Sequence, residues 1–285
     1  MVLKTYWRRV HGWPRRWRWP LKGVLLVLVV GLVLYPKPWL VPVWLGRLRN
    51  MNAVLDPGCP ALAELEARVV AEVGAGAPLE DVLAPVERAV CARIPYAYDW
   101  ETWGVMDYLP TVAEVFAQGR EDCDGRAVVA ASLLRRLGFE ASLASDLKHM
   151  WVVTPAGEIM SPGAGPKTIV GEAGGTRTTI ALGTVANLSR GMAFGVAVFP
   201  LTRELLIAAA VCAAAIHPWS SLRRRIAGCL LLVAALGLLR AAGASASDVA
   251  LHPALTWAGL LTAVGGWLVL VVRAGGRRSG AGRPQ

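Results

Sequence analysis

Apolar runs flanked by basic residues limit what this chain can fold into more than any other feature of its sequence. A helix needs about 20 consecutive apolar residues to cross the hydrocarbon core of a bilayer. We identify four candidate spans, and the shortest depends on Arg240 reaching the interface. The sequence therefore predicts an integral membrane protein with one N-terminal span and about three C-terminal spans. These spans cover residues 23–44, 193–216, 226–240 and 251–272.

Basic residues predict the orientation of the spans. The Trp- and Arg-rich segment 1–22 contains seven Lys or Arg and no acid, and more basic residues lie at 223–225 and in the tail 273–285. Four spans place all three segments on one side, so the positive-inside rule puts both termini in the cytoplasm. Residues 45–190 then form an extracytoplasmic domain, and the inner membrane of a bacterium is the expected location.

The first apolar run, at residues 23–35, has a basic start that a secretory signal would share. Two prolines follow the run, and no small-residue cleavage site is present. We therefore interpret residues 23–44 as an uncleaved anchor. In the C-terminal part, Arg203 and Glu204 interrupt the run at residues 193–216, and we expect this pair near the interface or against another helix.

The distribution of charge argues against a nucleic acid as the partner. The net charge is +10, but residues 37–190 contain 14 basic and 18 acidic residues. A surface that binds nucleic acid requires a basic face. We expect the lipid bilayer as one partner and a protein or peptide outside the membrane as the other. Three C-terminal spans exceed what anchoring requires, so a further partner within the membrane is left open.

Apolar residues at helical spacing predict two helices near the start of the soluble domain, at residues 62–73 and 79–94. A third helix is expected at about residues 111–118. Residues 163–175 are rich in Gly and Pro, which predicts a loop. The β-branched segment 176–182 after it predicts a strand.

The helix expected at residues 120–137 is apolar on almost every side and should be buried. Asp122 or Asp124 is suited to cap its start, which places Cys123 at or near the helix N-terminus. The helix dipole there favours a thiolate, whereas the two aspartates disfavour it. Pairing with an imidazolium would favour the thiolate again.

His149 is the one histidine of the soluble domain and opens a predicted strand, HMWVVT. A domain with one histidine and a cysteine at a helix start suits a nucleophile and its base. The spacing of Cys59, Cys91, Cys123 and His149 argues against a zinc site. On residue types alone, a cysteine near a buried helix is more often a small core residue than a nucleophile. An extracytoplasmic position also permits a disulfide between Cys59 and Cys91.

Three motifs carry a resemblance to a known family: DCDGRA at 122–127, LLRRLGF at 133–139 and HMWV at 149–152. In order and spacing they resemble the core of the transglutaminase-like superfamily, over residues 96–162. The resemblance implies an α+β, papain-like fold in which a cysteine-bearing central helix packs on an antiparallel sheet. N-terminal helices precede that helix, and the whole domain is inserted between transmembrane helices.

The resemblance also implies an activity. Cys123 would be the nucleophile that attacks a peptide or carboxamide carbonyl to form a thioester, and His149 the general base. Protease, amidase and transamidase outcomes share this intermediate and are left open. We expect neither a cofactor nor a metal ion. The alternative is a catalytically impaired domain of this type that serves as a membrane-bound peptide-binding or scaffold protein.

One position departs from the pattern of the family. Ser161 stands where an aspartate usually orients the imidazole, and a serine supplies no charge. Asp146 and Glu158 are the acidic residues nearest in sequence that could replace it. Among the aromatic residues of the domain, Trp103 and Trp151 are the candidates for contact with substrate.

Overall fold

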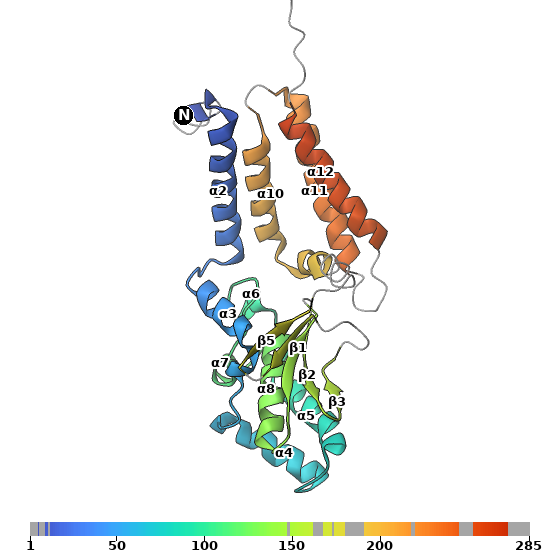
Figure 1. The fold of residues 1–285 in the computed structure, drawn as a ribbon. Coiled ribbons are helices and arrows are strands. Elements are labelled where there is room, and N and C mark those ends of the chain that lie inside the picture. The colour runs from blue at the N-terminus through green and yellow to red at the C-terminus, as the bar shows by residue number, and fades with distance from the viewer. Residues whose placement is uncertain are drawn as a thin grey trace, which may run out of the picture. The chain divides into compact units, whose positions relative to one another are not determined.

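The structure, a computed structural model, forms two compact units. One unit is helical and combines residues 1–33 with residues 193–285, and the other is the α+β unit at residues 34–192 (Figure 1). The structure describes residues 5, 9–10, 12–146, 149–161, 168–172, 174–179, 191–217, 220–244 and 253–272.

Long apolar helices build the helical unit. Within the described residues, three helices are long and apolar enough to cross a membrane, at Arg16–Leu34, Leu222–Gly243 and Ala254–Val271. A bent pair of shorter helices could form a fourth span. These lengths and compositions indicate a membrane protein. The labelled helices of this unit are α2 (Arg15–Leu34), α10 (Leu201–Ala215), α11 (Leu222–Ala244) and α12 (Pro253–Val271).

The N-terminal anchor differs from the prediction in its limits. Helix α2 begins at Arg15 and ends at Leu34, so it does not continue to residue 44. Tyr35 precedes Pro36, and a residue before proline disfavours the helical conformation. A separate helix, α3 (Leu40–Arg49), follows the break and belongs to the other unit.

The apolar run predicted at residues 193–216 is two helices instead of one straight span. Gly191–Val198 and Leu201–Ala215 meet at an angle of 112°. Pro200 stands at the break and precedes the first residue of α10. Within α10, Glu204 forms an ion pair with Arg240 of α11, so this charge packs against another helix, one of the two predicted locations.

The α+β unit combines seven α- and 3-10 helices that precede α8 with one sheet that follows it (Figure 1). The predicted helices at 62–73, 79–94 and 111–118 are confirmed within two residues at each end. The helices after α3 are η1 (Met51–Val54), η2 (Pro60–Leu62), α4 (Ala63–Val73), α5 (Leu79–Arg93), α6 (Asp99–Thr102), α7 (Val112–Gln118) and α8 (Cys123–Arg136).

The sheet has five strands, all antiparallel, in the order β3-β2-β1-β4-β5. The strand predicted from HMWVVT is confirmed as β2. Three strands were not predicted: β1 has the weak strand formers of SLAS, β3 is only three residues long, and β4 lies inside the segment predicted as a loop. The strands are β1 (Ser142–Ser145), β2 (Met150–Thr154), β3 (Gly157–Ile159), β4 (Ile169–Glu172) and β5 (Gly175–Thr178).

The predicted strand at 176–182 is only partly matched, because β5 ends at Thr178. Residues 180–182 lie outside the described residues, as do residues 163–167 and 173 of the segment predicted as a loop at 163–175.

Helix α8 is the centre of the α+β unit. From Gly125 to Leu134, every residue except Arg126 is buried. The helix packs on β1 and β2 and against α4, α5 and α7 (Figure 1). The prediction of a buried helix is confirmed, and its position brings the start of α8 next to the start of β2.

Candidate active site at the start of helix α8

Asp122 begins helix α8 as its N-terminal cap. Its Oδ1 accepts a hydrogen bond of 3.0 Å from the backbone N–H of Asp124. Of the two aspartates considered from the sequence, the structure selects the first. Cys123 is consequently the first helical residue, as expected.

The thiol of Cys123 has two polar neighbours. Its S–H donates to Asp124 Oδ1 at 3.3 Å, and the backbone N–H of Met150 donates to its sulfur. Met150 is the first residue of β2, so the nucleophile predicted from sequence lies against the strand that His149 precedes. The cysteine side chain is half-buried.

The surroundings of Cys123 favour the neutral thiol. Burial raises its pKa well above the ordinary value, and the negative charges of Asp124 and Asp122 raise this pKa further. The hydrogen bond from Met150 acts in the opposite direction but is a smaller effect. The thiolate that the helix dipole would favour is therefore not the resting form.

His149 is held on two sides. Its backbone N–H donates to Asp146 Oδ1 at 2.8 Å, and its Nε2 lies 2.7 Å from the carbonyl oxygen of Met160. A carbonyl only accepts, so Nε2 carries the proton of this hydrogen bond. In the neutral ring Nδ1 is then the basic nitrogen. This assignment follows from the acceptor and fixes the tautomer.

Met160 was not predicted as a site residue, although its peptide orients the imidazole. It is the one non-glycine residue with positive φ, at 57°, in the part of the chain that the structure describes. Its backbone N–H donates to Glu87 Oε2 of α5 at 3.2 Å. Helix α5 therefore helps to hold the unusual peptide that binds His149. A backbone carbonyl leaves no mark in the residue type, which is why no sequence motif identifies it.

The three residues considered as the orienting acid have other roles. Ser161 Oγ donates to Glu158 Oε2 at 2.7 Å, and Asp146 binds the backbone of His149. Within the described residues, the hydrogen bond to Met160 is the one that the imidazole ring makes. A main-chain dipole thus takes the place of the carboxylate that the family pattern would supply.

In the structure, Cys123 and His149 are linked only through the backbone of Met150, the residue after His149. Sγ contacts the N–H of Met150, and His149 is the preceding residue. No hydrogen bond between the thiol and the imidazole is present among the described residues.

The two tryptophans suggested for substrate contact are engaged inside the unit. Trp103 donates its indole N–H to Glu121 Oε1 and packs against Tyr108. Trp151 is 1% exposed, and its ring stacks at 6.5 Å on that of His149. Trp151 is thus buried, whereas Trp103 is partly exposed, and contact of either ring with a substrate stays a prediction.

Carboxyl groups crowd around the start of α8. Burial raises the pKa of Asp99, Glu121, Asp122 and Asp124, and neighbouring carboxylates raise it further at Asp99, Asp122 and Asp124. The backbone of Glu121 is paired with residues 95–97, which brings α6 and Asp99 to this end of α8. Burial and the neighbouring acids therefore oppose ionisation of each of these carboxyl groups, and burial together with Asp124 and Asp122 opposes ionisation of the thiol in the same way.

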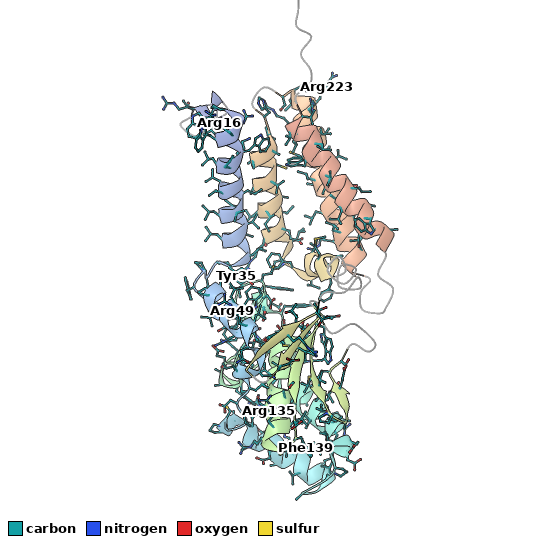
Figure 2. The ribbon with its side chains drawn as sticks, viewed as in Figure 1. Arg16, Tyr35, Arg49, Arg135, Phe139 and Arg223 are labelled. Atoms are coloured by element: carbon teal, nitrogen blue, oxygen red, sulfur yellow. The ribbon has the colours of Figure 1, made fainter. Side chains whose placement is uncertain are left out.

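The cysteines considered for a disulfide are both free, with Cys59 buried and Cys91 exposed. A cavity of about 630 Å³ lies at the other end of α8, between Arg135 and Phe139 among other residues (Figure 2). The chemistry-bearing residues are at the opposite end of the helix, so we assign the candidate site from geometry and not from cavity size.

Comparisons with known proteins do not add to these observations. Neither a protein-family model, nor a curated protein, nor a solved structure matches this chain. The site is therefore interpreted from its own geometry.

The raised pKa of Cys123 predicts slow alkylation at neutral pH. Because each unit of raised pKa removes about tenfold of the thiolate, iodoacetamide should label the exposed Cys91 at least about tenfold faster than Cys123 at pH 7. The difference between the labelling rates of Cys91 and Cys123 should become smaller as the pH rises, because more of Cys123 is then ionised. Peptide mapping by mass spectrometry measures both rates in one sample. Faster labelling of Cys123 than of Cys91 at pH 7 would show a thiolate and contradict this prediction.

Gly125 is required by the close approach of Glu121. A Cβ at this glycine would lie 2.2 Å from Glu121 Cγ, so Gly125→Ala must displace that side chain. We expect about 1–3 kcal/mol of destabilisation, measured as a lower unfolding temperature of the full chain in detergent. Gly46→Ala in α3 is the matched control, because nothing lies within 4 Å of its added Cβ. Equal unfolding temperatures for the two variants would refute the packing argument.

Proposed function

We propose that the α+β unit is a transglutaminase-like cysteine enzyme that acts on protein or peptide amides. The observation that supports this most directly is the 2.7 Å contact between His149 Nε2 and the Met160 carbonyl. It leaves Nδ1 as the basic nitrogen, one residue from the N–H that binds the Cys123 sulfur. A nucleophile and a base on adjacent elements are what acyl transfer through a thioester requires. The resemblance of residues 122–127 and 149–152 to that superfamily supports the same assignment.

In the proposed reaction, Cys123 Sγ attacks the carbonyl carbon of an amide while His149 Nδ1 takes the thiol proton. The proton passes to the leaving nitrogen, the C–N bond breaks, and a thioester remains on Cys123. Water or an amine then attacks the thioester while His149 takes a proton from this nucleophile, and His149 passes that proton to Sγ as the C–S bond breaks. Because the resting thiol is neutral, His149 acts as a general base and not as a preformed ion-pair partner.

The nature of the second acceptor decides the outcome of this reaction. Water would give a protease or amidase, and an amine would give a transamidase. The unit with Cys123 lies between the first apolar helix and the C-terminal helices in the sequence. The orientation proposed below puts this unit outside the membrane, so the proposed substrate is a protein or peptide on that side.

We also propose four spans, with both termini in the cytoplasm of a bacterial cell and the α+β unit outside. Figure 2 supports the orientation, because Arg16 of α2 and Arg223 of α11 lie at the same end of the helical unit. Basic residues at one end of a helical membrane unit favour the cytoplasmic side.

A general-base role predicts a large effect of removing the imidazole. The probe is p-nitrophenyl acetate, whose acyl group would be transferred to Cys123 with release of p-nitrophenol. We expect Cys123→Ala to abolish the burst and His149→Ala to slow it by about 10²–10⁴-fold. Cys91→Ser, which changes an exposed thiol, should leave the burst unchanged.

The alternative function is a catalytically impaired, membrane-bound domain that binds peptides or acts as a scaffold. The raised pKa of Cys123 and the absence of a carboxylate on the imidazole, within the described residues, favour this reading. The same experiment separates the two functions. If the wild-type chain shows no acylation that depends on Cys123, the enzymatic proposal fails and the scaffold remains.

Topology is tested with reporters. A fluorescent protein fused after Gln285 should be bright in the cytoplasm, because four spans return the chain to its starting side. As a matched control, alkaline phosphatase fused after Arg190 should be active, since this fusion ends after one span. Phosphatase activity from a fusion at Gln285 would indicate an odd number of spans and overturn the four-span arrangement.

A further inference from the structure

Two buried carboxyl groups and a partly buried one converge beside the start of α8, next to the proposed catalytic pair but separate from it. Oxygens of Asp99, Glu121 and Asp122 all lie within 4.8 Å of one another. Asp99 is 2% exposed and Glu121 is 0% exposed. Within the described residues, no Lys or Arg forms an ion pair with any of the three. Buried carboxylates this close repel one another strongly unless a proton or a cation lies between them.

An unpartnered oxygen points to a missing ligand at this place. Asp99 Oδ2 accepts a hydrogen bond of 2.6 Å from the backbone N–H of Tyr108. Asp99 Oδ1 is fully buried and receives no hydrogen bond from any donor. This carboxyl also lies within hydrogen-bonding range of Glu121, which is itself an acceptor when ionised. A buried acceptor with no donor is rare in folded proteins, and a bound cation would satisfy it.

The side chain of Glu121 is held in place by the surrounding elements. Trp103 donates its indole N–H to Oε1, and the backbone N–H of Asp122 donates to Oε2 at 2.9 Å. On the other side, Gly125 leaves the space that the Glu121 methylenes occupy. Both oxygens retain a second lone pair for another ligand. The cluster is therefore preorganised from α6, the segment before α8 and the first turn of α8.

We propose that Asp99, Glu121 and Asp122 bind a hard divalent cation, with Ca²⁺ as the best fit. These oxygens lie within 4.8 Å of one another, close enough to share one ion. Ca²⁺ takes about six to eight oxygen ligands in flexible geometry, whereas Mg²⁺ keeps several waters and is usually held by only one or two protein carboxylates. Zinc prefers nitrogen and sulfur ligands, which this set does not contain.

The site would also have a structural effect on α8. An ion held by Asp99 and by the two residues that lead into the helix ties α6 to the start of α8. It also offsets the negative charge next to Cys123 without contacting the sulfur. The inference does not depend on the proposed enzymatic activity, because the ion would bind whether or not the thiol reacts.

Terbium luminescence tests the proposal with the full chain in a neutral detergent. Tb³⁺ replaces Ca²⁺ at oxygen sites, and Trp103 contacts the ligand Glu121, so excitation of the indole should sensitise Tb³⁺ emission. We expect Ca²⁺ to displace this signal and to raise the unfolding temperature of the wild-type chain. Absence of both effects would overturn the proposal. A proton shared between the carboxyl groups would then be what relieves their repulsion.

Variants locate the ion. Asp99→Asn and Glu121→Gln should each weaken Ca²⁺ binding by at least about tenfold in isothermal titration, since each removes one charged ligand. Glu80→Gln, at an exposed carboxylate in the first turn of α5, is the matched control and should bind as the wild type does. Unchanged binding in both ligand variants would place the ion elsewhere and refute this site. Titration of Cys123→Ala keeps the result independent of catalysis, because this variant should still bind Ca²⁺.

Discussion

Burial of helix α8 is the constraint on which the α+β unit depends. The sheet covers the helix through β1 and β2, and α4, α5 and α7 pack against its other sides. A helix buried so completely has its polar groups only at its ends, where capping groups and neighbouring elements must satisfy them. Asp122 does so at the first turn, and this places Cys123 under the start of β2. The packing that buries α8 therefore also fixes the position of the nucleophile.

The same burial sets the chemistry of the site. Taking carboxyl groups and a thiol out of water favours their neutral forms, and the acids around Cys123 reinforce this. A cysteine in such a field depends on a base that acts during the reaction. It also lies next to an oxygen cluster that gains from a cation. The proposed general base and the proposed Ca²⁺ site therefore both follow from a helix start that is rich in acidic residues and poorly hydrated.

The imidazole shows how a missing side chain is replaced by the fold. Ser161 stands where the resemblance would place an orienting acid, and its hydroxyl donates to Glu158. The carbonyl of Met160 holds the ring instead, and Glu87 of α5 holds that peptide. A carbonyl selects the tautomer as an aspartate would, but it stabilises an imidazolium less because it carries no full charge. This favours a reaction in which the charged imidazolium exists only briefly.

Residue patterns alone determined the apolar helices, the buried helix with Cys123 at its start, the amphipathic helices before it and the strand that follows His149. Those features follow from local periodicity and capping, which the order of residues records directly. Only the tertiary structure decided the rest. The break after α2, the bend before α10 and the pairing of β1 with β4 depend on prolines and on partners distant in sequence. The contact from Met160 and the meeting of Asp99 with Glu121 depend on backbone atoms and on packing between elements, for which no single residue type is a signal.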